Sequence, residues 1–228
     1  MIIYNTQIKT NLFVNDEYND RVYKYYSEES IKDNKYNQIQ GNLSFVTPVK
    51  FNDPFDCNTL YKNSIDISDM FRVLCLTKDC RNILMWSYYA SNHSGYCFGF
   101  DLNDIIKSVE KQKINGICII GPVKYKKNRP DIVIKKNKFF FSDIKDYIDV
   151  TFTKYKEWKH EKEYRMVMIS DDFRMNKEYA KEYISIQAPV KEYIYGCKST
   201  KSIKGINKII KEKRLCKDDE KYFLIERK

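Results

Sequence analysis

Three charged residues at alternate positions late in the chain could carry chemistry. Glu161, Glu163 and Arg165 lie in the run 161–169, whose alternating pattern predicts a β-strand. Side chains at alternate positions of a strand share a face, so the three are expected on one side. Neighbouring carboxylates repel each other. Either one of them has a raised pKa, or Arg165 and a nearby Lys hold both in a structural ion network.

A second segment, residues 86–101, combines aromatic side chains with one of the two histidines. It is predicted to start within a helix over 83–90 and to end as a strand over 96–100. His93 falls on the break between them, where it either contributes to function or bonds the local backbone. Three aromatic residues of the helix could stack on a flat ligand or belong to the core: Trp86, Tyr88 and Tyr89.

The sequence Asn52-Asp53-Pro54 predicts a tight turn, because Asn and Asp side chains bond the backbone that follows them and Pro fixes φ. Phe51 and Phe55 would pack the turn against the core. Two interpretations stay open. Either the turn is a structural corner in which Asp53 caps backbone amides, or it lines a pocket together with the two segments above.

Several common catalytic and metal-binding motifs are absent from the sequence. It has no Gly-rich phosphate loop, no Gly-x-Ser-x-Gly elbow, no His-x-x-x-His and no Cys-x-x-Cys. We therefore expect no metal. The seven Cys are odd in number and scattered through apolar runs, which is typical of buried thiols in a reducing cytoplasm.

The order of the expected elements favours an α+β fold, with a largely antiparallel sheet, possibly split, and flanking helices. Strands are expected over residues 21–26, 42–46, 71–77, 96–100, 116–125 with an interruption at Gly121-Pro122, 161–169, 184–186, 190–195 and 222–225. Helices are expected over 27–33, 83–90, 103–111, 142–155 and 200–211. Residues 1–20 are expected to form an N-terminal arm, loose or an edge strand, and residues 21–228 a single globular domain.

The net charge of +10 raises the question of a nucleic-acid partner. Most of the basic residues are Lys, whereas Arg is the usual residue for bidentate phosphate and base contacts. A solvated basic surface is therefore favoured, and the alternative footprint would be residues 126–138 with the Lys-rich C-terminal helix. The sequence has no apolar run near 18 residues and no signal-peptide pattern, so we expect a cytoplasmic protein without a membrane partner.

Several blocks occur together and in order: Tyr23-Lys24-Tyr25, Phe51-Asn52-Asp53-Pro54-Phe55-Asp56, Leu84-Met85-Trp86, His93-x-Gly95-x-Cys97, Glu161-x-Glu163-x-Arg165 and Ile194-Tyr195-Gly196. Together they resemble the bacterial family called domain of unknown function 2971. The resemblance covers most of the chain and implies a stand-alone cytoplasmic protein. Some members lie near mobile or defence genes, which implies a role in phage defence or as a toxin.

A second resemblance concerns mechanism. Glu-x-Glu on a late strand, a basic residue on an early strand and a middle segment rich in Ser, Tyr and Trp are similar to the ADP-ribosyltransferase-like superfamily. This implies a split sheet with NAD, as substrate, bound in a cleft. A carboxylate would stabilise the charge that develops when the nicotinamide–ribose bond breaks. The chain departs from that pattern in having Lys24 where Arg or His is usual, and in lacking a Ser-Thr-Ser block.

The superfamily resemblance also implies roles for the candidate residues. Glu163 would be the catalytic carboxylate and Glu161 its partner. The residues expected to bind NAD are Lys24, Tyr25, Trp86, Tyr88, Tyr89, His93 and Arg165, and the expected pocket lining is Asn52, Asp53 and Pro54. A macromolecular target is a further expected partner. Two other functions stay open: a protein that binds or acts on nucleic acid, and a non-enzymatic sensor or interaction module with a closed charged network.

Overall fold

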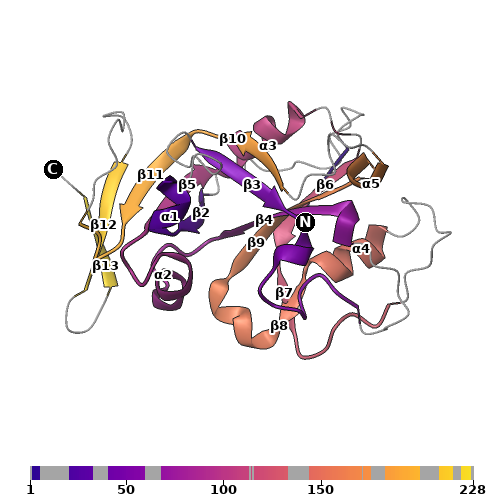
Figure 1. The fold of residues 1–228 in the computed structure, drawn as a ribbon, viewed down its shortest axis with the longest axis horizontal. Helices are drawn as coiled ribbons and strands as arrows, with labels where there is room; N and C mark the ends of the chain where they lie inside the picture. Colours follow the sequence, from indigo (N-terminus) through magenta and orange to yellow (C-terminus); the bar gives the residue numbers. More distant parts are fainter. Residues whose placement is uncertain are drawn as a thin grey trace. The chain divides into compact units, whose positions relative to one another are not determined.

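The computed structural model describes residues 2–5, 21–32, 41–59, 68–112, 114, 116–132, 144–170, 172–175, 183–200, 211–217 and 222–226. Helices are interspersed with many short strands, and most of the strand pairs are antiparallel (Figure 1). The predicted α+β class is therefore confirmed.

The chain forms two compact units, each assembled from three separate segments. The first contains Met1–Asn15, Phe45–Cys75 and Lys113–Ile184. The second contains Asp16–Ser44, Leu76–Gln112 and Ser185–Lys228. The domain boundaries predicted from the sequence stay a prediction.

The first unit is built on antiparallel strands. β1 (Ile2–Asn5) pairs with β6 (Ile117–Pro122), which pairs with β9 (Glu163–Ile169). On its other side β9 neighbours β4 (Phe71–Thr77). β1 is an edge strand, one of the two alternatives for residues 1–20, and the rest of that range lies outside the described residues.

Apolar side chains of the sheet and of one helix form the core of the first unit. Ile119 and Val167 are opposite each other in the β6–β9 pair, and both are fully buried. Tyr147 and Val150 pack against them from helix α4 (Ile144–Thr151), where their spacing puts both on one face. This core fixes the strand that carries the candidate carboxylates.

The chain between α4 and β9 differs from the prediction of one helix over 142–155. After α4 it forms β8 (Thr153–Tyr155), which pairs in parallel with β7 (Lys124–Lys126). A 3₁₀-helix, η5 (Lys156–Glu161), then leads to β9. The helix ends early because Thr153–Tyr155 forms ladder pairs with β7, which no local pattern reveals.

The predicted strand over 161–169 is wrong at its first two positions. Glu161 is the last residue of η5, and Lys162 adopts a left-handed conformation with φ 46° and ψ 46°. The strand itself begins at Glu163. Glu161 therefore reaches its neighbours from the end of a 3₁₀-helix, not from the strand face that Glu163 and Arg165 share.

The second unit has a sheet in the order β2 (Arg21–Tyr26), β5 (Tyr96–Asp101), β11 (Val190–Tyr195), β12 (Lys211–Lys217) and β13 (Tyr222–Glu226). Its pairs are antiparallel except for the parallel pair of β11 and β12. β5 is almost wholly buried and β11 largely so. Their aromatic side chains contact one another, as Phe98 and Tyr193 do with ring centroids 4.6 Å apart.

The predicted C-terminal helix over 200–211 is almost wholly outside the described residues. Only its ends are described, and Lys211 is the first residue of β12. Strand β12 was not predicted, because its sequence, KEKRLCK, is charged and lacks the β-branched residues that mark strands. Strand β13 was predicted.

Helices of the second unit begin within one residue of the predicted places. They are α1 (Glu28–Lys32), α2 (Ile83–Tyr89) and α3 (Leu102–Glu110). Asn82 caps α2, because its side-chain oxygen accepts hydrogen bonds from the backbone N–H groups of Leu84 and Met85 in the first turn.

The remaining short elements are η3 (Pro48–Lys50), η4 (Ser68–Met70), α5 (Asp172–Met175), β3 (Asn42–Val46) and β10 (Tyr183–Gln187). β3 pairs with β10, where the hydroxyls of Ser44 and Ser185 are 3.1 Å apart. Both strands were predicted from their sequences.

Six of the seven cysteines have side chains that the structure describes, and none of these six forms a disulfide: Cys57, Cys75, Cys80, Cys97, Cys118 and Cys197. Four of the six are buried, as predicted from the apolar runs around them. Within the described ranges, no helix has both the length and the apolar character needed to cross a membrane.

Candidate functional site

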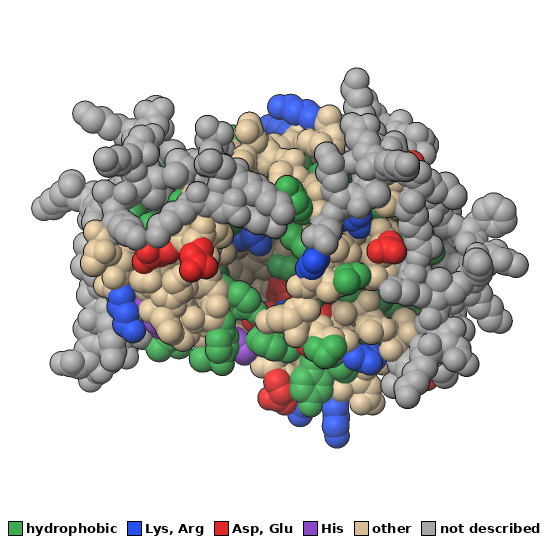
Figure 2. Space-filling model, viewed as in Figure 1, with side chains coloured by type: hydrophobic (Ala, Val, Ile, Leu, Met, Phe, Trp, Pro, Cys, Tyr) green, Lys and Arg blue, Asp and Glu red, His purple; other side chains and the backbone are tan. Residues whose placement is uncertain are grey.

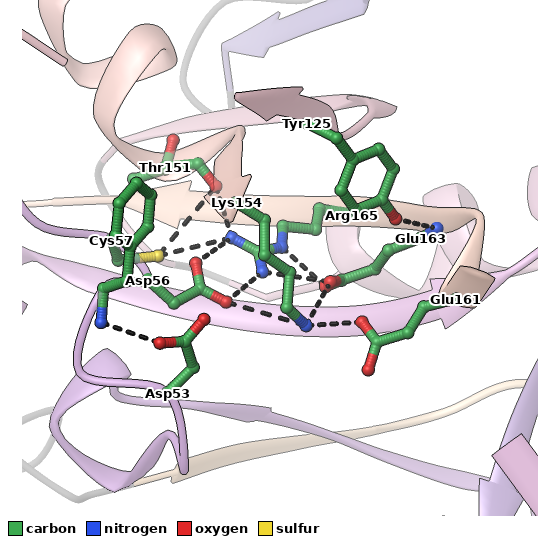
Figure 3. A network of polar contacts seen from close by, with 10 residues as sticks. Asp53, Asp56, Cys57, Tyr125, Thr151, Lys154, Glu161, Glu163 and Arg165 are labelled. Carbon is green, nitrogen blue, oxygen red and sulfur yellow. Dashed lines mark hydrogen bonds and ion pairs between the residues drawn. The ribbon is translucent and has the colours of Figure 1, made fainter. Parts of the chain in front are cut away.

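Five charged side chains of the first unit form one buried cluster (Figure 3). Asp56 comes from the turn after Pro54, Lys154 from β8, Glu161 from the end of η5, and the last two from β9. The members are Asp56, Lys154, Glu161, Glu163 and Arg165. The cluster thus combines three carboxylates with two cations.

Arg165 is the centre of the cluster and is completely buried. Its Nη1 and Nη2 donate to the two carboxylate oxygens of Asp56, at 2.7 and 2.5 Å. Its Nε and Nη2 donate to the oxygens of Glu163, at 2.6 and 3.0 Å. Nη1 also donates to the carbonyl of Thr151 (2.6 Å) and contacts the sulfur of Cys57 (3.4 Å). The guanidinium fork is therefore occupied on every side.

Burial alone would favour neutral groups in this cluster, but the opposite charges outweigh it. Burial disfavours the charged form of Arg165, yet Glu163 and Asp56 raise its pKa well above the usual range. Burial likewise acts to raise the pKa of Glu163, but Arg165 and Lys154 hold it well below its usual value. Of the two interpretations of this carboxylate, the structure supports an ionised, ion-paired group.

The backbone of Glu163 is held as firmly as its side chain. Its N–H donates to the hydroxyl of Tyr125 at 2.8 Å. Its carbonyl accepts from the N–H of Val123 at 3.0 Å. With Arg165 and Lys154 on the carboxylate, this residue is fixed at four points.

Lys154 links the two carboxylates that the sequence singled out. Its Nζ lies 2.5 Å from Oε2 of Glu161, 3.0 Å from Oε2 of Glu163 and 3.8 Å from Oδ2 of Asp56. The indole ring of Trp158 lies over the same ammonium, with its centroid 5.1 Å away. Burial acts to lower the pKa of Lys154, but Glu163 and Glu161 raise it, so the side chain stays charged.

The Asn52-Asp53-Pro54 turn has the capping bond that the structural interpretation predicts. Oδ1 of Asp53 accepts from the N–H of Phe55 at 2.8 Å. The carbonyl of Pro54 accepts from Nη2 of Arg129 at 2.6 Å, and that guanidinium lies 5.2 Å from the Phe55 ring centroid. Asn52 and Pro54 are exposed. The turn is therefore a structural corner, and it positions Asp56 to contact Arg165 in the charged cluster.

Trp86 and Tyr25, two of the predicted ligand-binding residues, are buried in the core of the second unit. The Trp86 ring is completely buried, and its N–H donates to the carbonyl of Cys80 at 2.8 Å. The hydroxyl of Tyr25 donates to the carbonyl of Asp79 at 2.8 Å. The two rings meet edge to face at 5.2 Å. Neither ring offers a face on which a ligand could stack.

Tyr88, Tyr89 and Lys24 are more accessible members of the same unit. Tyr88 is 62% exposed, and Tyr89 is half-buried with its ring centroid 6.4 Å from that of Tyr88. Lys24 is half-buried on β2, opposite Phe98 in the β2–β5 register. The sequence predicted that these residues face Glu161 and Glu163. Because those carboxylates belong to the first unit, this stays a prediction.

His93 lies in a turn of three consecutive left-handed residues, Ser91, Asn92 and His93, with φ of 46°, 53° and 73°. Its N–H donates to the carbonyl of Trp86, and its carbonyl accepts from the N–H of Lys198, at 3.1 and 3.0 Å. Burial, and next Lys198, lower the pKa of the imidazole, so the ring is neutral near pH 7. The structure thus supports a backbone-bonded turn residue.

Close contacts with Gly196 and Gly95 explain how this turn fits. A Cβ at Gly196 would lie 2.0 Å from the carbonyl oxygen of His93. A Cβ at Gly95 would lie 2.3 Å from the carbonyl oxygen of Tyr26. Both glycines therefore allow backbone segments to approach more closely than any side chain permits.

The basic side chains do not gather in one place on the face drawn in Figure 2, where the described Lys and Arg form separate small groups. Within the proposed footprint, Lys126 and Lys127 are exposed, whereas Arg129 holds the turn at Pro54. Residues 133–138 and 201–210 of that footprint lie outside the described residues. A nucleic-acid partner stays a prediction.

Lys154 and Asp56 are members of the cluster that sequence reasoning missed. Asp56 ends the Phe51–Asp56 block, and an acidic residue next to a predicted turn is a weak signal. A nearby Lys was expected beside the two carboxylates, but Lys154 lay inside a predicted helix and was not identified as that residue. Among the described residues, no group of three His, Cys, Asp or Glu side chains is arranged to hold a metal ion.

The comparisons with known proteins give one match. Residues 85–166 match the model of a family described as "Protein of unknown function (DUF2971)". The resemblance to this family is confirmed over those residues, which include Trp86, His93 and the whole Glu161–Arg165 segment. No curated protein and no solved structure matches the chain.

Proposed function

We propose that the protein cleaves the nicotinamide–ribose bond of NAD and passes ADP-ribose to water or to a macromolecular target. In this proposal Glu161 is the working carboxylate and Glu163 is a positioning residue. These roles are the reverse of those that the superfamily resemblance implies. The contacts are the reason: Glu163 is fixed at four points, whereas Glu161 contacts the Lys154 ammonium outside the Arg165 fork.

The observation that carries the proposal is the shared ammonium. Nζ of Lys154 is 2.5 Å from Glu161 and 3.0 Å from Glu163, so both carboxylates contact the same ammonium. All three side chains are buried, so the site contains little water. Charge interactions are strongest where water is excluded. A carboxylate held in this way can stabilise positive charge on a reacting sugar without having to reorganise.

The chemistry balances without another co-reactant. The C1′–N bond of NAD breaks, its electron pair leaves with nicotinamide, and positive charge builds on the ribose carbon. Glu161 stabilises that charge. Water, or an oxygen or nitrogen of a target, then bonds to C1′ and releases its proton to solution.

Substrate access requires a side chain to move, because Glu161 and Glu163 are 3% and 5% exposed. Trp158 is half-buried and its ring lies over Lys154. We infer that this ring turns aside when the nucleotide enters and stacks on its flat base.

The test is release of nicotinamide from labelled NAD by the purified protein, with and without cell extract. We expect Glu161→Gln to lower the rate roughly 100-fold or more, as loss of a charge-stabilising group does. Glu157→Gln is the matched control, because Glu157 lies on the same 3₁₀-helix with its side chain 69% exposed. No release by the wild type would overturn the proposal.

One observation favours a second candidate, a non-enzymatic interaction module. Arg165 uses its whole fork on groups of its own unit, as a purely structural network would. On that hypothesis Glu161→Gln lowers the free energy of unfolding, and neither it nor the wild type turns over NAD.

A further inference from the structure

Glu163 is contacted by two residues that lie opposite each other on neighbouring strands. In the parallel pair of β7 and β8, Tyr125 lies opposite Lys154. The Lys154 ammonium contacts the Glu163 carboxylate at 3.0 Å, and the Tyr125 hydroxyl accepts the Glu163 backbone N–H at 2.8 Å. Figure 3 shows both side chains reaching the start of β9.

The Tyr125 hydroxyl still has a hydrogen bond to give. A phenol oxygen accepts through its lone pairs and donates through its single O–H. Among the described residues, Tyr125 accepts the Glu163 N–H and donates to none. Tyr125 as a whole is half-buried, in contrast to the buried Glu163 that it contacts. Because the Glu163 N–H occupies one lone pair of the phenol oxygen, the Tyr125 O–H can point in only a limited range of directions before any ligand binds.

We propose that Tyr125 is a substrate-binding residue that donates its phenol hydrogen bond to an oxygen of the nucleotide ribose beside Glu161. This inference rests on the proposed function and adds a specific contact to it. A hydrogen bond from a fixed donor would orient the ribose so that its C1′ faces the carboxylate.

The charges around Tyr125 suit a donor. Burial, followed by the nearby Glu163 and Glu161 carboxylates, raises its pKa to about 12, although the Glu163 N–H and Lys154 act in the opposite direction. Among the described residues, the charged groups that act on the phenol are Glu163 on β9, Glu161 on η5 and Lys154 on β8. The hydroxyl therefore keeps its proton at neutral pH.

The first variant is Tyr125→Phe, which removes the donor and leaves the ring. We expect kcat/KM for nicotinamide release to fall about tenfold, the loss expected for one hydrogen bond. The matched control is Tyr155→Phe on the neighbouring strand, where the ring contact with Phe55, at 5.3 Å, does not need the hydroxyl. This control should keep the wild-type rate.

Tyr125→Phe also removes the acceptor of the Glu163 N–H, so a second variant separates the two roles. A fluorinated tyrosine at position 125 keeps the oxygen but ionises at lower pH. If the phenol donates to substrate, activity of this variant is lost as pH rises through the lowered pKa, while the wild type stays active over the same range. Identical pH profiles would mean that the oxygen only accepts, and would overturn the inference.

The outcomes distinguish this inference from the proposed function. An active wild type, an inactive Glu161→Gln and a Tyr125→Phe with wild-type kcat/KM would overturn the role of Tyr125 alone. A wild type that releases no nicotinamide would overturn the proposed function, and the inference with it.

Discussion

Glu163 and Arg165 lie two residues apart on one face of β9 and are joined by two hydrogen bonds, Nε to Oε1 at 2.6 Å and Nη2 to Oε2 at 3.0 Å. The pair is buried, and Asp56 closes the other side of the guanidinium. A buried ion pair gains little over an apolar pair, but losing one member leaves a charge without compensation. The stability of the first unit should therefore depend on Arg165 being present.

We expect Arg165→Met to lower the free energy of unfolding by about 3–5 kcal/mol, because Asp56 and Glu163 would keep buried charges without their main partner. Urea denaturation followed by circular dichroism measures the loss. Arg165→Lys should also be clearly destabilising, because an ammonium cannot form the two-sided fork. Lys156→Met, at a side chain that is 52% exposed, is the control. A loss for Arg165→Met no larger than that of the control would contradict the prediction.

The lowered pKa of Glu163 predicts loss of stability in acid. Its folded pKa lies below the ordinary 4.5, so its stabilising contribution is complete above that value and is lost as pH falls through the folded pKa. Urea midpoints measured from pH 7 down to pH 2 should therefore drop below about pH 4.5. The Glu163→Gln protein should be less stable at pH 7 and show a shallower drop. Parallel curves for the two proteins would rule out this role of Glu163.

Replacing Lys162 by glycine should affect the thermal midpoint differently from most glycine substitutions. Its left-handed conformation, φ 46°, is unfavourable for residues with a Cβ by roughly 1 kcal/mol or more. Lys162→Gly should therefore keep or slightly raise the thermal midpoint, although glycine usually destabilises. Lys159→Gly, at an exposed position within the same 3₁₀-helix, should lower it. Equal losses at both positions would show that the conformation of Lys162 carries no strain.

Trp158 should report nucleotide binding by fluorescence. The chain has two Trp, and the other, Trp86, is completely buried. If the Trp158 ring moves and stacks on the base, NAD should change the emission of the wild type and have little effect on Trp158→Phe. A change of the same size in that variant would place the response elsewhere.

Local patterns predicted the fold class, most elements and the shared face of Glu163 and Arg165. They failed at Glu161, because the left-handed Lys162 that separates it from β9 has no signal in a run of alternating residues. Thr153–Tyr155 was misassigned to a helix, because its strand exists only through pairing with β7.

The cluster itself depends on distant contacts. Arg165 meets Asp56 across 109 positions, and no periodicity within either segment links them. The candidate ligand-binding rings were misjudged for the same reason. Trp86 and Tyr25 are residue types that suit a binding site, but both lie in the core. Burial is a property of the assembled unit and cannot be read from residue type.

The 109-residue separation of Arg165 and Asp56 also bears on folding kinetics. Bringing such distant segments together costs loop-closure entropy before the contact contributes any stabilisation. We expect the ion network to be absent from the folding transition state. Arg165→Met should then speed unfolding and leave the refolding rate nearly unchanged in stopped-flow measurements. The network would act as a latch that sets the lifetime of the native state.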